Sequence, residues 1–528
     1  MQAKNETFAL ESPITKITGK DRLELTREDL IKVIVKQQIE RLTFHYTAVD
    51  GKIKELRIPL ANRRQAEIIL AEGERLDGSS LFKGIIDQSN SDLYVVPDYK
   101  TAFLNPFDET SLNFICRFLT HKGERASFTP DNILNNAANA LLKNTGCELQ
   151  AHSEMEFYLI TPKENNLYPI PKQKGYHAAA PYVKTGKVLD EMVKYITHIS
   201  GHVKYGHHEV GCLDNIESDY DEINGKRAEQ VEIEFSLSKI DEAADNTVLA
   251  KWIIRNVAYK YGYVATFAPK MEIGHAGNGM HFHLALFKNG KSIMNDKSGK
   301  LSNEALKLIG GLCRYAPSLT SFGNMVSASY LRLVPNQEAP TKVCWGERNR
   351  SVLIRVPLGW TNVSNLAQKI NPQQKDPLLD EPNRQTVELR SPDGSALSHF
   401  LLSGATMAAD WGLKNEKESL NIAKQSHVSV NVHSSPSDTD LAELSTSCVE
   451  SAEMLMQHRY LYERDNVFPA EVINYISTTL QNENDKNLNK RLMAMPDDER
   501  QKESRRIMHR DIHKHWFKFF PLLLENQF

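Results

Sequence analysis

The sequence lacks two features that would point to a membrane or nucleic-acid function. No apolar run approaches the ~20 residues that a membrane-spanning helix needs, and MQAKNETFALESPITK, at the start, has no apolar segment typical of a signal peptide. The 528 residues carry a net charge of only −3, with 41% hydrophobic and 25% charged residues, which gives no sign of a nucleic-acid-binding surface. We therefore expect a cytoplasmic protein, without nucleic-acid or membrane partners, that acts on small molecules.

Cysteine is also scarce, and its spacing excludes a familiar kind of site. The six cysteines are scattered, and no pair has the C-x-x-C spacing of a zinc or redox motif. We predict free, buried thiols rather than disulfide bonds. They stand at positions 116, 147, 212, 313, 344 and 448.

Hydrophobic periodicity predicts a mixed α and β chain without internal repeats. A helix is expected to follow the N-cap residue Thr26, with helical spacing over residues 26–45, and short alternating segments come after it. Residues 131–145 read as a helix and 148–160 as a strand, and the chain after residue 400 is mostly helical. The segment HWFKFFPLLLENQF, at 515–528, is apolar, so it is expected to pack either on its own domain or on another subunit.

Four expected strands each place two polar side chains on one face, because residues two apart on a strand point the same way. A single pair of this kind is explained by a sheet with one solvated face. Four pairs rich in Glu and His indicate more, since crowded carboxylates repel one another unless a divalent cation neutralises them. Oxygen ligands with an occasional imidazole favour Mg²⁺ or Mn²⁺. The pairs are Glu154 and Glu156, Glu232 and Glu234, His281 and His283, and Glu388 and Arg390.

A cluster of arginines accompanies these carboxylates. Arg332, Arg348, Arg350 and Arg355 lie within one short span, and arginine forks bind phosphate or carboxylate in a bidentate way. Metal-binding carboxylates beside arginines are the parts needed for phosphoryl transfer from a nucleotide. A Walker A loop is missing, because NGKS at 289–292 lacks the preceding glycine, where Ala285 stands.

An ordered set of motifs resembles the glutamine synthetase family, in its type I form. The motifs are SEMEFYLI, KGYH, HHEVG, QVEIEF, ATFAPK, GNGMHFHLAL, SYLRLVPNQEAP, RNRSVLIRVP and VELRSPDGSA, in the order of the family. The resemblance implies an α+β fold with an N-terminal β-grasp-like domain over residues 1–120. A catalytic domain over 121–528 would carry a curved antiparallel sheet shaped as a funnel and flanked by helices. It also implies a homo-oligomer of two stacked rings, a dodecamer, with each site between adjacent subunits.

The resemblance also implies a role for each matching residue. One Mg²⁺ or Mn²⁺ ion would be held by Glu156, Glu209 and Glu232, and a second by Glu154, Glu388 and His281. The ATP contacts would come from His283, Arg350 and Arg355. The glutamate and ammonium contacts would come from Arg332, Arg390, Gly277 and Tyr176. Glu338, in NQEAP, matches the flap residue that closes over the intermediate.

The sequence departs from the family at several places. Ala48 stands where the family has the aspartate that binds ammonium in the neighbouring subunit's site, and Asp50 lies two residues on. Ala276 and Thr386 replace a usual asparagine and a nucleotide-binding arginine, with Arg384 nearby. Insertions occupy 211–229 and 359–385, either as surface loops or as gates to the site.

Three functions remain open from the sequence. The first is an ATP-dependent ligase that forms glutamine from glutamate and ammonia through γ-glutamyl phosphate. The second is a glutamate–amine ligase that uses another amine, which the loss of acid at position 48 favours. The third is a non-catalytic, nitrogen-sensing relative, which six filled metal-ligand positions disfavour.

Overall fold

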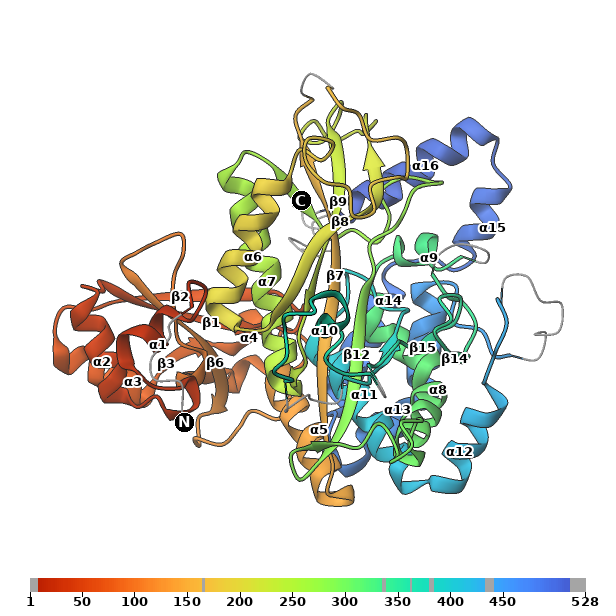
Figure 1. Ribbon diagram of the computed structural model, residues 1–528. Helices are drawn as coiled ribbons and strands as arrows, with labels where there is room; N and C mark the ends of the chain where they lie inside the picture. Colours follow the sequence, from red (N-terminus) through yellow and green to blue (C-terminus); the bar gives the residue numbers. More distant parts are fainter. Residues whose placement is uncertain are drawn as a thin grey trace, which may run out of the picture.

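The computed structural model describes residues 8–163, 167–334, 339–360, 363–378, 384–432 and 441–512. A small N-terminal unit packs beside a larger unit that is built around a long curved sheet (Figure 1). Helices and strands are both abundant in the two units, and the α+β class predicted from the sequence is confirmed. No helix within the described ranges is long and apolar enough to cross a bilayer.

The N-terminal sheet has the order β2-β1-β6-β4-β3, with the short β5 paired to β6. Strand β1 runs parallel to β6, and the other pairings are antiparallel. The strands are β1 (Arg41–Thr47), β2 (Ile53–Pro59), β3 (Glu74–Asp77), β4 (Asp92–Pro97), β5 (Phe103–Leu104) and β6 (Ser111–Thr120). The helices are α1 (Pro13–Thr18), α2 (Arg27–Lys36), α3 (Arg63–Glu72) and α4 (Gly78–Leu81).

The helix expected over 26–45 is shorter in the structure. Thr26 does cap it: the backbone N–H of Asp29 donates to the Thr26 hydroxyl, and the N–H of Thr26 donates to the Asp29 carboxylate. The helix ends at Lys36, and Gln38 turns the chain with a φ of 52°. Residues 41–47, RLTFHYT, are rich in aromatic and β-branched side chains, and their pairing with two neighbouring strands outweighs the helical spacing.

The large sheet has the order β14-β15-β16-β12-β7-β9-β8, and β10, β11 and β13 pair at its margins. All its pairings are antiparallel except β14 with β15. The long strands are β7 (Glu148–Thr161), β8 (Val203–Leu213), β9 (Arg227–Phe235) and β12 (Met280–Lys288). The short ones are β10 (Ser238–Lys239), β11 (Val264–Thr266), β13 (Lys291–Ser292), β14 (Trp345–Glu347), β15 (Ile354–Val356) and β16 (Val387–Leu389).

The helices of this unit pack mainly on one face of the sheet (Figure 1). Those before β14 are α5 (Pro130–Thr145), α6 (Gly186–Ser200), α7 (Ile240–Lys260), α8 (Asn303–Gly323) and α9 (Ser329–Arg332). Those after β15 are α10 (Ala367–Ile370), α11 (Ser398–Lys414), α12 (Glu416–Gln425), α13 (Cys448–Glu463), α14 (Ala470–Gln481), α15 (Leu488–Met493) and α16 (Asp497–Arg510).

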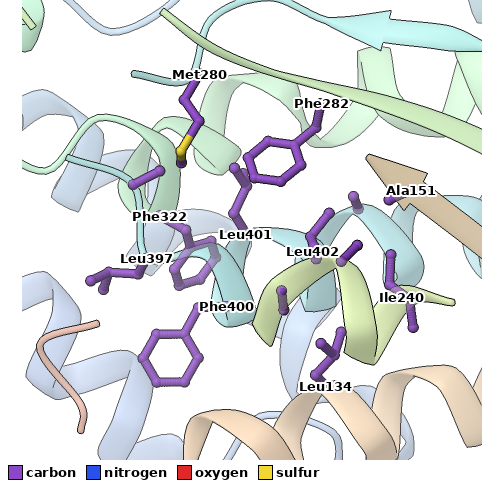
Figure 2. Packing of buried hydrophobic residues seen from close by; sticks show 14 of the residues in the cluster. Leu134, Ala151, Ile240, Met280, Phe282, Phe322, Leu397, Phe400, Leu401 and Leu402 are labelled. Carbon is purple, nitrogen blue, oxygen red and sulfur yellow. The ribbon is translucent and has the colours of Figure 1, made fainter. Parts of the chain in front are cut away.

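The hydrophobic core lies between the sheet and these helices. Met280 and Phe282 of β12 point toward Phe322 of α8 and toward α11, where Leu401 lies (Figure 2). Burying one such side chain contributes about 1.5–3 kcal/mol. Since side chains alternate along a strand, the polar residues next to these apolar ones point to the opposite face of the sheet. All six cysteines are buried and free, as predicted.

Candidate active site

The register of the central strands brings the predicted polar pairs into one row on the face away from the helices. His281 of β12 stands opposite Glu154 of β7, and Glu154 stands opposite Glu234 of β9. In the next row Glu156 stands opposite Glu232. At least one member of each of the four predicted pairs therefore faces a common space.

That space is a cavity of about 810 Å³. Most of the residues predicted from the sequence line it, and they come from β7, β8, β9, β12, α9 and the loops around β15 and β16. Those lining it are Glu154, Glu156, Tyr176, Glu209, Glu232, Gly277, His281, Arg332, Arg350 and Arg390. Glu388, His283 and Arg355 lie behind this lining and connect to it through the contacts described below.

Glu156 and Glu232 are held in an electrostatically strained arrangement. Burial, followed by repulsion from Glu209, raises the pKa of Glu156 to about 8. Burial also raises the pKa of Glu232 well above its ordinary value, with further contributions from Glu154 and Glu156. Carboxylates crowded in this way need a positive partner to ionise, so the residues present fit a bound divalent cation.

Glu154 lies between two imidazoles. His281 Nδ1 is 3.1 Å from Glu154 Oε2, and His283 Nε2 is 2.8 Å from Glu154 Oε1. Burial acts to raise the pKa of Glu154, but attraction to His283 and His281 outweighs it, and the pKa lies well below the ordinary value. Of these carboxyl groups Glu154 therefore ionises most readily, whereas Glu156 and Glu232 hold their protons more tightly.

Glu388 completes this side of the site and is fully buried. Its Oε1 accepts from Arg390 Nη1 at 2.6 Å, and its Oε2 accepts from Arg355 Nη1 at 2.8 Å. His281 Nδ1 is 3.4 Å from Glu388 Oε1. Arg355 thus contacts a predicted metal ligand directly, at a position opposite Glu388 in the β15–β16 register.

A glycine-rich loop brings its backbone close to the same group. The N–H of Gly279 donates to Glu156 Oε2 at 2.8 Å. A Cβ at Gly279 would lie 2.7 Å from His281 Nε2 and 2.9 Å from Arg332 Nη2, so a larger residue does not fit there. Arg332 is buried and donates to the carbonyl of Ser391 at 2.8 Å. GNG therefore serves close packing around metal-ligand candidates rather than a nucleotide-phosphate loop.

Asp50 does not line this cavity as the single chain forms it. Asp50 lies in the turn between β1 and β2. Its Oδ2 is 3.5 Å from Lys52 Nζ and 3.9 Å from Lys54 Nζ. The neighbouring Gly51 packs against Leu397, in the helical layer below the sheet. Ala48 is buried. Glu338 lies outside the described residues.

The structure adds residues that were not assigned from the sequence. Nε2 of His207, on β8, lies 3.7 Å from Glu232 Oε1, and its Nδ1 lies 3.9 Å from Glu209 Oε1. These three residues are therefore a possible ligand set. In the sequence HHE, His207 stands two residues before Glu209, and this spacing is the signal that could have identified it. Gln230 donates to Glu156 Oε2 at 3.3 Å and to the carbonyl of Gly277 at 2.9 Å, and nothing in its sequence context marked it.

The insertion at 211–229 connects the cavity wall to helix α16. Arg505 Nε donates to Glu272 Oε2 at 2.7 Å, and Arg505 also pairs with Glu217 of the insertion. His509 Nε2 lies 3.0 Å from the carbonyl of Met271, and its Nδ1 lies 3.0 Å from Ser218 Oγ. Helix α16 thus binds both the insertion and the loop that leads to Gly277.

The insertion at 359–385 lies beside a different cavity. It includes α10, and Gly359 and Gln385 line a space of about 810 Å³ together with Trp345 and His427. The described residues of this insertion do not line the cavity that holds the carboxylates.

Comparison with known proteins agrees with this geometry. Residues 38–121 match the model of the glutamine synthetase β-grasp domain, and residues 127–491 match that of the glutamine synthetase catalytic domain. The chain belongs to the glutamine synthetase family. The N-terminal β-grasp domain expected from the sequence is thereby confirmed.

Relatives from bacteria and archaea share the family over most of their length. The chain is 29% identical over 460 residues to a glutamine synthetase of Mycolicibacterium smegmatis, covering 80% of this chain and 85% of the relative. It is 31% identical over 384 residues to a glutamine synthetase of Pyrococcus horikoshii, covering 72% and 76% respectively. Among solved structures, the Plasmodium falciparum glutamine synthetase aligns with a TM-score of 0.69 at 20% identity, covering 88% of this chain and 97% of that chain.

Proposed function

We propose that this chain is an ATP-dependent ligase that forms glutamine from glutamate and ammonia through γ-glutamyl phosphate. One observation carries the proposal: six acidic and imidazole side chains and three arginines, which are far apart in the sequence, meet around one cavity. The cavity presents Glu154, Glu156, Glu209, Glu232 and His281 with Arg332, Arg350 and Arg390, and Glu388 lies directly behind His281.

The chemistry requires such a concentration of positive charge. A carboxylate is a poor electrophile, because an oxide is a poor leaving group, and phosphorylation converts it to an acyl phosphate that an amine attacks. Both steps gather negative charge in one place, and preorganised cationic groups are most effective where that charge develops. Water must be excluded, or the acyl phosphate hydrolyses.

The residues divide this work by position. We assign Arg332 and Arg390 to the carboxylates of glutamate, with Gly277 as a backbone contact. Arg350 and Arg355 would stabilise the transferring phosphoryl group, and His283 would contact the ATP phosphates. Tyr176, half exposed at the cavity edge, is assigned to the ammonium pocket. Glu338 would close over the site.

The divalent ions are assigned to Mg²⁺ or Mn²⁺. Glu156, Glu209 and Glu232 would hold one, and Glu154, His281 and Glu388 the other, because these sets combine oxygen ligands with one imidazole. When bound, such ions neutralise phosphate charge. The raised pKa values of Glu156 and Glu232 support this assignment.

The position of Asp50 supports a homo-oligomer. Its turn packs on the helical side of the sheet, against Leu397, whereas the cavity opens on the other side. An acid from this turn therefore reaches a cavity only if the cavity belongs to another copy of the chain. We propose the stacked double ring that the family resemblance implies, with Asp50 entering the neighbouring site.

A second candidate function is ligation of glutamate to an amine other than ammonia. The observation that favours it is Ala48, which is buried and apolar at the position where the family has its ammonium-binding acid. Asp50 is engaged with Lys52 and Lys54, so a free ammonium ion has one anionic partner fewer.

Purified protein with ATP, Mg²⁺, glutamate and a panel of amines separates these functions. Phosphate release that depends on ammonia supports glutamine formation. Release with methylamine or a polyamine but not with ammonia would replace it by the second function. ATP binding without turnover on any amine would identify a non-catalytic relative.

A further inference from the structure

Three buried side chains next to the predicted metal ligands form a group that the proposed reaction does not use as a metal site. His152 of β7, Glu234 of β9 and His283 of β12 offer ligand atoms within 4.8 Å of one another. Their exposed fractions are 6%, 1% and 5%. His152 faces His283 across the β7–β12 pairing, and Glu234 faces Glu154 across the β7–β9 pairing.

The imidazole of His152 lacks a partner on the side that faces this group. Its Nδ1 is buried and has no hydrogen-bond partner among the described residues. It lies 3.8 Å from Glu234 Oε1, which is too long for a hydrogen bond. Two ligand atoms that each lie ~2.1 Å from a tetrahedral ion are roughly 3.4 Å apart. The spacing is therefore closer to that of two ligands on one cation than to that of a direct bond.

The two histidine rings stack against each other. They are parallel, with an interplanar angle of 8° and a centroid separation of 4.4 Å. Since the nitrogens of parallel rings lie side by side, both rings must turn about χ2, a broad torsion, to bind one ion, and His283 Nε2 must leave Glu154.

We propose that His152, Glu234 and His283 form an additional cation site that takes a zinc-like transition ion. Two imidazoles and one carboxylate suit Zn²⁺ or Co²⁺, whereas Mg²⁺ prefers ligand sets made of oxygen. Glu156, Glu209 and Glu232 are such an oxygen set. The two kinds of site therefore differ in the ions that they select.

Lys204 is the competitor of that ion. Its Nζ lies 2.5 Å from Glu234 Oε1, and its side chain is 41% exposed. Because Glu234 is buried, its carboxylate needs a cationic partner, and a bound ion supplies that charge when the partly exposed lysine leaves. The ammonium of Lys204 contacts the carboxylate of Glu234 when the ion is scarce, and it moves to solvent when the ion binds.

Co²⁺ titration followed by visible absorption, in a large excess of Mg²⁺ and without nucleotide, tests the site. Mg²⁺ fills the oxygen sites, so the wild-type chain is expected to bind one further Co²⁺ per chain with the strong absorption of tetrahedral nitrogen coordination. His152→Gln and Glu234→Gln should lose this ion. His458→Gln, which alters a half-buried histidine of α13 bonded to Ser318 of α8, should keep it.

Lys204→Met supplies a variant in which the three ligands stay intact. Removing the competing ammonium should tighten Co²⁺ binding by a few-fold, and circular dichroism checks that each variant is folded. The proposal is overturned if Mg²⁺ suppresses all Co²⁺ absorption in the wild type, if His152→Gln retains it, or if Lys204→Met binds no more tightly. None of these readouts depends on ligase activity, so the result is separate from that of the proposed reaction.

Discussion

Arg390, the residue directly after strand β16, places its Nη1 2.6 Å from Oε1 of Glu388 within that strand. Glu388 is fully buried, and Arg355 holds its other oxygen. The carboxylate is thus fixed by two arginines before any metal or substrate arrives. Two arginine contacts of this kind fix the orientation of the Glu388 carboxylate. No further free energy is then needed to order this ligand during catalysis.

Glu388→Ala should abolish phosphoryl transfer, because it removes a proposed ligand of the second ion and the carboxylate that Arg355 and Arg390 contact. Loss of supporting groups around metals typically costs about 10–100-fold in activity, and loss of the ligand itself should exceed that. The measurement is ATP- and glutamate-dependent phosphate release. Glu388→Gln, which keeps the size and an acceptor oxygen, guards against misfolding. Near-normal turnover in a folded Gln variant contradicts the assignment.

Binding of Mg²⁺ should strengthen as pH rises toward about 8. Burial and Glu209 raise the pKa of Glu156 to about 8, so below that pH the ion must displace a proton. Calorimetry in buffers of different ionisation enthalpy should detect proton release near pH 7 that fades above pH 8. Glu156→Gln should reduce the released proton count, and an affinity that does not vary between pH 6 and 8 would sink this prediction.

The same raised pKa predicts how the metal-free protein responds to pH. A carboxyl whose pKa is higher in the folded state binds its proton more tightly there. The contribution of this group to the free energy of unfolding is therefore fully present at low pH. It is lost as the pH rises from about 4.5 to about 8. Chelator-treated protein should show a falling melting temperature across that window, and saturating Mg²⁺ should reverse the fall. An unchanged melting temperature would speak against the buried, protonated form.

Asp50→Asn should raise the Michaelis constant for ammonium if Asp50 replaces the acid missing at Ala48. Removing one anionic partner of a small cation should cost a few-fold to about tenfold. Initial rates against ammonium concentration provide the measurement. Asp92→Asn, an exposed acid on β4 that pairs with Arg75, is the matched control. A constant that matches the control means that Asp50 plays no part in ammonium binding.

His509→Ala and Arg505→Ala should raise the Michaelis constant for glutamate while changing the turnover number less. Both residues hold the loop at 271–272 that leads to Gly277, and each lost buried or charge-assisted bond is worth about 1–3 kcal/mol. Arg506→Ala is the control, because the side chain of Arg506 donates to Glu503 within α16. Equal effects in Arg505→Ala and Arg506→Ala would rule out a positioning role for the loop contact.

The alternating polar pairs explain how much of the site the sequence could predict. Period-two alternation places Glu154 and Glu156, or His281 and His283, on one face without any tertiary knowledge. It does not give register, which depends on how strands align. The opposition of His152 to His283 is therefore visible only in the fold.

The fold was predicted well where the pattern is long and less well where it is short. The helix expected at 131–145 appears as α5, Pro130–Thr145, and the strand expected at 148–160 appears as β7, Glu148–Thr161. The helix expected at 26–45 ends at Lys36, since residues 41–47 pair with β2 and β6 inside the sheet. The docking of α16 on the insertion had no local signal, because Arg505 and Glu217 are far apart in the chain.

Helix α16, the last described helix of the chain, is attached to the loop before Gly277 and so to the pocket that we propose for glutamate. A purification tag or fusion partner placed beyond this helix would perturb that pocket. One placed before α1 would perturb the separate N-terminal sheet instead. Kinetic constants measured on differently tagged preparations should accordingly disagree in glutamate affinity before they disagree in any other quantity.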